Sequence, residues 1–179
     1  MASVGGLTGG IVHMFNHAII KGGLFMVVGC FALRLGSVHL QDMRGAGKTM
    51  PWTSLAWVLG GLGLIGVPMT AGFISKWLLL TSAIEAERWP VAVLMLLSSL
   101  LALVYIWRVV EVLYFSEETS ERAEKAVEAP MSMLVPMYVV IGATIVFGVW
   151  TEYSAGFAED AARSLLSIVD TAVESGGTP

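Results

Sequence analysis

The chain has 179 residues, of which 56% are hydrophobic and 13% are charged, and its mean hydropathy is +0.77. Soluble domains carry about 25% charged residues, so this composition excludes an ordinary soluble domain and predicts a membrane protein built from apolar helices. The net charge of -4 comes without a basic patch or nucleic-acid motif, so we expect no nucleic-acid partner. The single cysteine, Cys30, lies in an apolar stretch and excludes an internal disulfide.

The first apolar segment, residues 5–33, carries three ionisable side chains at a spacing of four residues: His13, His17 and Lys21. On a helix this spacing places them on one face, in a stripe about 12 Å long. A charged group at the centre of a membrane span costs at least about 2.5–3.5 kcal/mol. A stripe of three such groups therefore requires a buried, hydrated surface, which is typical of an ion pathway or a proton relay.

Two other readings of this stripe stay open. A histidine in a span often only hydrogen-bonds to a neighbouring helix, and a lysine can extend its ammonium to the membrane interface. His13 and His17 also have a spacing that can bind a metal. No carboxylate or thiol lies near them in the sequence, so we predict neither a metal nor another cofactor.

The second apolar segment, residues 53–86, follows a loop with three basic residues and is too long for one membrane helix. It would measure about 50 Å if fully helical, against a hydrocarbon core of about 30 Å. Pro68 and Gly72 predict a break, because proline removes a backbone donor and glycine permits a non-helical backbone. Lys76 follows that break. A proline kink with close packing through the nearby glycines would explain the break, but not the lysine.

Residues 89–115 form a third apolar segment, and Arg108 and Glu111 near its end lie three residues apart. We expect an ion pair within the helix, and as a second reading a place at the mouth of an ion path. An acidic linker at residues 116–129 precedes a fourth apolar segment, residues 130–150. The sequence thus predicts an all-α fold with about four transmembrane helices, one of them discontinuous.

Residues 154–179 differ in character from the membrane domain expected over residues 1–153. Their apolar and charged side chains alternate with a helical period, which predicts an amphipathic helix followed by a disordered tail from Ser175. The basic residues concentrate in the connections at 34–52 and 116–129. By the positive-inside rule these connections face the cytoplasm, so both termini are expected outside the cell's inner (plasma) membrane.

Two stretches carry a resemblance to a known family. GLTGGIVHMFNHAIIKGGLF (residues 6–25) resembles the His-x3-His-x3-Lys helix of the proton-translocating antiporter-like membrane subunits. GVPMTAGFISKW (residues 66–77) resembles the broken helix of the same family, with its terminal lysine. The family includes subunits of respiratory complex I, of membrane-bound hydrogenases and of the Mrp-type cation/proton antiporters. Together with LSSLLALVYIWRVVE (residues 97–111), the second stretch looks most like the D-type subunit of the Mrp antiporters.

The resemblance implies that this chain corresponds to the C-terminal part of such a subunit. Family members have about fourteen helices in two inverted repeats, so the first repeat and the other membrane subunits are expected partners. The resemblance also implies roles: Lys21 as the central proton carrier, His17 and His13 as the extension of the relay, and Lys76 as its terminal gate.

The function that follows is proton relay within a multisubunit antiporter exchanging protons for a monovalent cation, sodium being the candidate. One alternative is a proton-pumping, non-redox subunit of complex I or of a hydrogenase. The other is a structural scaffold, which predicts that apolar replacements of Lys21 and Lys76 are tolerated. A transporter subunit is favoured over an enzyme.

Overall fold

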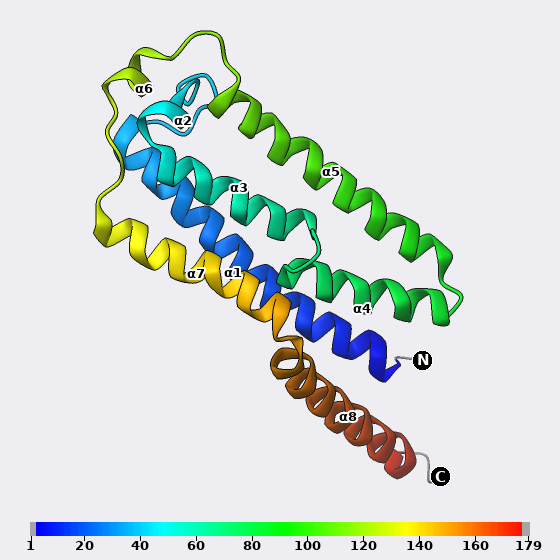
Figure 1. Ribbon diagram of the computed structural model, residues 1–179. Helices are drawn as coiled ribbons and strands as arrows, with labels where there is room; N and C mark the ends of the chain where they lie inside the picture. The colour runs from blue at the N-terminus through cyan, green and yellow to red at the C-terminus, as the bar shows by residue number, and fades with distance from the viewer. Residues whose placement is uncertain (1–2, 177–179) are drawn as a thin grey trace.

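The computed structural model describes residues 3–176, and all regular elements in this range are helices (Figure 1). They are α1 (Val4–Leu35), α2 (Ala46–Thr49), α3 (Pro51–Ile65), α4 (Ala71–Glu85), α5 (Trp89–Tyr114), α6 (Glu121–Lys125), α7 (Met131–Val149) and α8 (Thr151–Gly176). By length and composition α1, α5 and α7 can each cross a membrane, whereas α3 is apolar but shorter. The all-α prediction is confirmed, and the apolar segments match the helices to within a few residues.

Helix α1 is the centre of the arrangement, because α3, α4, α7 and α8 all pack against it (Figure 1). At its C-terminal half, Val27, Cys30 and Phe31 have no exposed surface and join a core with residues of α3, α5 and α7. Cys30 is therefore a small buried packing residue. The same helix thus supplies the main core from its C-terminal half and the ionisable stripe from the residues before it.

The second apolar segment is divided into α3 and α4 by residues 66–70, as predicted. Helix α3 ends at Gly66, whose φ of 91° is left-handed, a conformation that favours glycine. Pro68 follows, and without an N–H it cannot donate to the carbonyl of Leu64. Thr70 then caps α4: its Oγ1 accepts from the N–H of Phe73 at 3.4 Å and donates to the carbonyl of Val67 at 2.6 Å.

Gly72 requires a correction, because it lies inside the first turn of α4 rather than in the break. The prediction that it supplies non-helical backbone is wrong. Its missing side chain matters for packing instead: a Cβ at Gly72 would collide with the carbonyl oxygen of Gly63 in α3. Gly60 and Gly61 likewise let α3 approach Leu24 of α1 and Ile106 of α5, which is how small residues are used between membrane helices.

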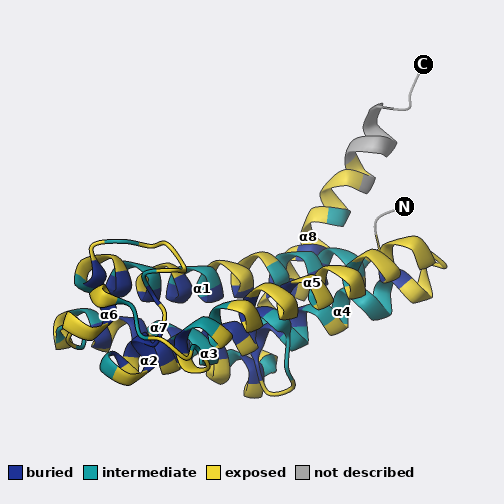
Figure 2. Cartoon of the chain, turned by 90° about the horizontal axis from the view of Figure 1, so that it is seen from above, coloured by how far each residue is buried: buried dark blue, intermediate teal, exposed yellow. Residues whose placement is uncertain are grey.

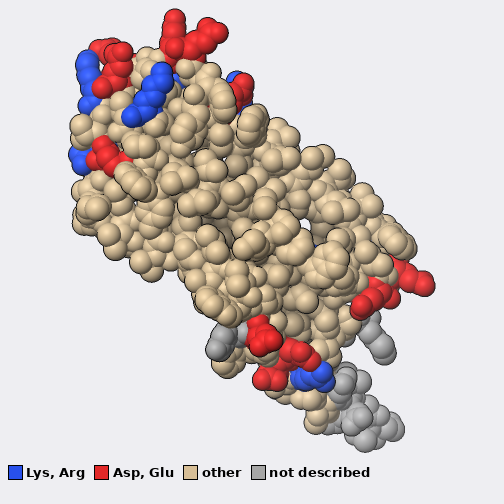
Figure 3. Space-filling view, viewed as in Figure 1, with Lys and Arg blue, Asp and Glu red and all other residues tan. Residues whose placement is uncertain are grey.

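Charged side chains gather at the two ends of the bundle (Figure 3). The face in view shows Lys, Arg, Asp and Glu around α2 and α6 at one end and mainly Asp and Glu at the other, with uncharged residues between them. An uncharged belt between two charged ends is the surface pattern of a protein that spans a bilayer.

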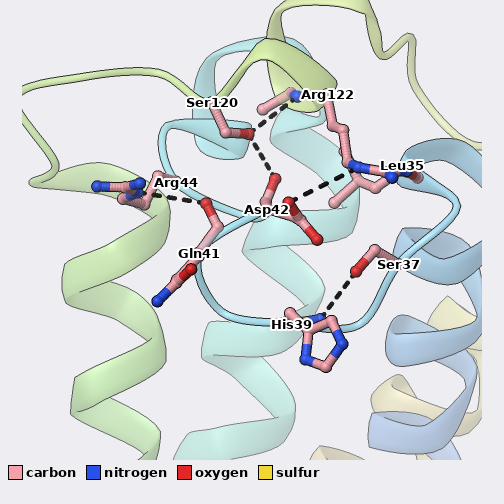
Figure 4. Close-up of polar contacts among 9 residues, drawn as sticks. Leu35, Ser37, His39, Gln41, Asp42, Arg44, Ser120 and Arg122 are labelled. Atoms are coloured by element: carbon pink, nitrogen blue, oxygen red, sulfur yellow. Dashed lines mark hydrogen bonds and ion pairs between the residues drawn. The ribbon is translucent and has the colours of Figure 1, made fainter.

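The connections at the α2–α6 end are held together by side chains (Figure 4). Ser120 Oγ donates to the carbonyl of Asp42 at 2.6 Å. Arg122 donates from Nη1 to the carbonyl of Leu35 at 2.8 Å, and its Nε lies 3.7 Å from the Asp42 carboxylate. Arg122 thereby satisfies a carbonyl at the C-terminal end of α1, where a cation also complements the helix dipole.

Glu128, in the linker before α7, caps the N-terminus of α3. One carboxylate oxygen accepts from the N–H groups of Trp52 and Thr53 at 2.7 and 3.4 Å, and the other accepts from the Thr53 hydroxyl at 2.6 Å. The first N–H groups of a helix lack partners within the helix, and a negative charge there is favourable. Helix α3 is therefore anchored at its outer end by a residue 75 or more positions away.

Helix α8 leaves the bundle obliquely and is largely exposed (Figure 2). It packs on α1 and α7, and among those of its residues whose burial is described, the buried ones are the small Ala158 and Ala162. The larger apolar residues Phe157, Leu165, Ile168 and Val169 remain 49–78% exposed. Helix α8 begins at Thr151 and continues through Gly176. The prediction of a disordered tail from Ser175 is therefore wrong for Ser175 and Gly176, which are helical, and residues 177–179 lie outside the described residues.

Candidate functional site

A pocket of about 300 Å³ lies between α1, α3, α4 and α5 and contains three of the predicted relay residues. His13 and His17 of α1 face Lys76 of α4 across it, and Ser98 and Tyr105 of α5 complete its polar lining. The rest of the lining is apolar. Polar groups from several helices thus converge on one partly enclosed space at the level of the broken helix.

Helices α1 and α4 are joined here by two polar contacts. His13 Nδ1 lies 3.0 Å from Ser75 Oγ, and the Asn16 side-chain amide donates to the carbonyl of Ala71 at 2.8 Å. Asn16 and Ser75 have no exposed surface. The rings of His13 and His17 are 5.5 Å apart between centroids. These contacts fix His13 toward α4, whereas His17, one turn further, is more exposed.

Lys76 binds the end of α3. Its Nζ donates to the carbonyl oxygens of Leu64 and Ile65 and to the hydroxyl of Ser99, each at 2.9 Å. The Leu64 carbonyl needs such a donor because residue 68, its usual helical partner, is proline. A positive charge is also favourable at the C-terminus of a helix. The break therefore creates the acceptors that hold the lysine in an otherwise apolar environment.

Lys21 is placed differently from the other three. It is half-buried on α1, one turn beyond His17, and it is not among the residues that line the pocket. It belongs to none of the four ion pairs found within the described range 3–176. His17 lies on α1 between His13 and Lys21, one helical turn from each, and it lines the pocket together with Lys76.

Arg108 and Glu111 form the predicted pair within α5, with 2.8 Å between Nη1 and Oε2. Their side chains are 66% and 48% exposed, so the pair contributes little to stability. Neither residue lines the pocket, although Tyr105, one turn earlier, does. A role at the mouth of an ion path remains a prediction.

Sequence reasoning missed four polar groups of the site: Asn16, Ser75, Ser98 and Ser99. Each is a small polar residue inside an apolar helix, and such residues are common between membrane helices without a further role. A usable signal did exist. Asn16 is adjacent in sequence to His17, and Ser75 is adjacent to Lys76.

The arrangement can bind and pass protons. Imidazole and amine groups both gain and lose protons, and three of them share one pocket. Metal binding has less support, because the described part of the chain holds no group of three or more His, Cys, Asp or Glu side chains suited to a metal. Two histidines beside a cation do not complete the usual three- or four-ligand set.

Comparison with known proteins shows which family the chain belongs to. Residues 1–102 match the family model described as NADH:quinone oxidoreductase/Mrp antiporter, TM. The NADH-quinone oxidoreductase subunit N of Desulforudis audaxviator is 38% identical over 157 residues, a match covering 82% of this chain and 31% of that protein. The D-type Na(+)/H(+) antiporter subunit of Bacillus subtilis is 27% identical, with 90% of this chain and 32% of that protein covered.

The fold is also similar to a solved structure, that of the Mrp complex from a Dietzia species. The TM-score is 0.80 at 20% identity, and the match covers 89% of this chain and 38% of the other. The chain thus spans about a third of the length of the curated relatives that it matches.

Proposed function

Because this chain belongs to the NADH:quinone oxidoreductase/Mrp antiporter transmembrane family, we propose that it relays protons through the membrane as part of a multisubunit ion-translocating complex. The observation that carries the proposal is the convergence of His13, His17 and Lys76 on one pocket beside a broken helix. Discontinuous helices at membrane depth are typical of transport sites, because their free backbone groups need a cavity or a bound ion.

The family resemblance inferred from the two motifs is confirmed by the family match. So is the class of protein: an all-helical membrane subunit related to Mrp antiporter and complex I subunits. The named relatives are subunits of larger assemblies, so other membrane subunits are partners of this kind of chain. The particular ions, and the part of the fold that lies outside these 179 residues, belong to the proposal.

The proposed route runs along α1 and ends at α4. Lys21 passes a proton to His17, one helical turn away, and His17 passes it through the pocket to Lys76, with His13 as a side branch held by Ser75. The ring centroids of His13 and His17 are 5.5 Å apart, and both side chains line the pocket, whose water is the proposed carrier between them. Pocket geometry supports the His17–Lys76 part of this route most directly.

Two coupling reactions fit the relay. Exchange of protons for sodium is the reaction in the name of the Bacillus subtilis relative, a Na(+)/H(+) antiporter subunit. Coupling to quinone chemistry is implied by the name of the Desulforudis audaxviator relative, which has the higher identity, 38% against 27%. In the second case this subunit holds no redox centre and moves protons only.

Inverted membrane vesicles that contain the complete complex distinguish the two. With a pH-sensitive dye inside, sodium added to acidified vesicles raises the internal pH if the complex exchanges sodium for protons. An electron donor instead lowers the internal pH if the complex is a redox-driven pump. Vesicles from a strain lacking the complex are the control. If neither response occurs, proton translocation is contradicted, and the remaining hypothesis is that the chain is a structural scaffold.

For the location we propose the cell's inner (plasma) membrane, with the α2–α6 end in the cytoplasm and both termini outside. Arg34, Arg44 and Lys48, together with Arg122 and Lys125, lie at the α2–α6 end, whereas Arg88 and Arg163 lie at the other. The positive-inside rule then gives the orientation.

Single cysteines test this orientation. In a complex whose Cys30 has been replaced by alanine, Ser37→Cys is expected to react with a membrane-impermeant thiol reagent only in inverted vesicles. Glu85→Cys, at the exposed end of α4, is expected to react only in intact cells. The reverse pattern would invert the proposed topology.

A further inference from the structure

The hydroxyl of Ser99 in α5 is hydrogen-bonded to Lys76, but Ser99 has no role in the proposed relay. Its hydroxyl is one of three partners of Lys76 Nζ, and the other two are the backbone carbonyls of Leu64 and Ile65, all at 2.9 Å. An ammonium has three N–H donors and no acceptor. All three donors are therefore used while Lys76 is charged.

The three partners respond differently when Lys76 loses a proton. A neutral amine keeps two N–H donors and gains a lone pair that accepts a hydrogen bond. A backbone carbonyl can only accept, so the two remaining N–H groups can still serve Leu64 and Ile65. The third partner must then change from acceptor to donor. A hydroxyl can do this by rotating about its Cβ–Oγ bond, since it both donates and accepts.

We propose that Ser99 is a positioning residue for proton release from Lys76; this inference rests on the proposed function. The N–H that bonds to Ser99 is the one that is released: it turns to a water of the adjoining pocket, which Lys76 lines, and its proton passes to that water. The electron pair of the broken bond stays on Nζ, and the other two N–H groups stay on the carbonyls of Leu64 and Ile65. The Ser99 hydroxyl, which accepted from the ammonium, then donates to that electron pair. Lys76 keeps three hydrogen bonds in both states, so its Nζ stays against the end of α3 throughout the cycle.

The surroundings of Lys76 favour a fixed Nζ. A Cβ added to Gly66 would lie 3.1 Å from Lys76 Cδ, so the lysine stem passes close over the break with little room to move aside. Within the described residues, the hydroxyl of Ser99 has Lys76 as its hydrogen-bond partner. The neighbouring Ser98 also lines the pocket, but its hydroxyl donates to the carbonyl of Met95 in its own helix at 2.8 Å.

Ser116, just past the end of α5, is a control for Ser99, because its hydroxyl donates to the carbonyl of Val112 in α5 at 2.9 Å and it does not line the pocket. In the complete complex, Ser99→Ala is expected to slow proton translocation at least about tenfold, the rate equivalent of one hydrogen bond to a charged group. Ser99→Thr keeps the hydroxyl and is expected to stay within about threefold of the wild type. Ser116→Ala is expected to leave the rate unchanged. Each rate is divided by the amount of assembled complex.

A second measurement separates positioning from a purely structural role. If proton release from Lys76 becomes slower in Ser99→Ala, the ratio of rates in H2O and D2O is expected to rise above the wild-type ratio. A packing defect would reduce the amount of complex and leave this ratio unchanged. A wild-type rate and ratio in Ser99→Ala, or equal losses in Ser99→Ala and Ser99→Thr, would overturn the proposal.

The same experiment shows which proposal has failed. An inactive Lys76→Met with a normal Ser99→Ala overturns only the role of Ser99. A fully active Lys76→Met overturns the relay itself, and the role of Ser99 with it.

Discussion

Replacing Lys76 with methionine is expected to abolish proton translocation by the complete complex, lowering the rate at least about 100-fold. Methionine has a similar length but can neither carry a proton nor donate a hydrogen bond. The variant also leaves the carbonyls of Leu64 and Ile65 without the donor that Lys76 provides. A buried carbonyl without a partner costs about 1–3 kcal/mol, so some loss of stability is expected besides the loss of transport.

Lys76→Arg separates these two effects. A guanidinium keeps a positive charge and five N–H donors, so it can still bind the carbonyls at the end of α3 and preserve the break. It does not release its proton in proteins. If Lys76 is a relay group, the arginine variant is expected to assemble normally and to translocate no protons. If Lys76 only caps α3, the arginine variant is expected to be active.

The measurement is proton translocation in inverted vesicles, with complex assembly determined by native gel electrophoresis of the same membranes. Arg163→Met serves as the control, because Arg163 is an exposed cation of α8 outside the pocket. Wild-type rates in both Lys76 variants would mean that the relay ends at another residue. An inactive methionine variant with an active arginine variant would assign Lys76 a structural role.

The sequence predicted the break in the second segment because its cause is local. An apolar helix longer than the thickness of the hydrocarbon core must be interrupted, and Pro68 marks the position of the interruption. The spacing of His13 and His17 likewise predicted one helix face, because helical geometry alone decides it. That Lys76 shares a pocket with them followed from the family resemblance and the need of an intramembrane cation for a cavity.

Rules of local sequence could not predict the contacts between residues that lie far apart in the chain. Ser98 and Ser99 are adjacent serines in an apolar helix. Only the packing of α5 on α4 decides that Ser99 bonds to Lys76, whereas Ser98 bonds to a backbone carbonyl of its own helix. Glu128 appeared as one of several acidic residues in a solvated linker, yet it caps α3. The apolar face of α8 was predicted from its period, but its large apolar residues stay exposed, and the buried ones among its described residues are Ala158 and Ala162.

The interpretation of Gly72 failed for a related reason. Glycine near a proline is typical of a non-helical turn, and the sequence gives no sign of how close a second helix lies. In the structure Gly72 is helical, and its lack of a side chain allows the start of α4 to lie against the carbonyl of Gly63 near the end of α3. This contact sets the distance between the two half-helices, and therefore the position of Lys76 relative to Leu64 and Ile65.

Gly72→Ala is accordingly expected to prevent assembly or to destabilise the subunit by about 3 kcal/mol or more, at the upper end of overpacking effects. The added Cβ meets a backbone oxygen, which cannot turn away as a side chain can. Gly142→Ala in α7 is the matched control, because a Cβ at Gly142 has no heavy atom within 4 Å. Alanine is the better helix former by about 0.5–1 kcal/mol, so this control is expected to be as stable as the wild type or more stable.

The two variants are compared by the amount of assembled complex in membranes and by the thermal midpoint of the solubilised complex. Assembly of Gly72→Ala at the level of Gly142→Ala, with an equal midpoint, would contradict the close approach of α4 to α3. If the Gly72→Ala complex assembles with a lowered thermal midpoint, its rate of proton translocation is also expected to be lower. Because the half-helices are then forced apart, Lys76 no longer reaches both carbonyls, and proton translocation per assembled complex is expected to fall as well.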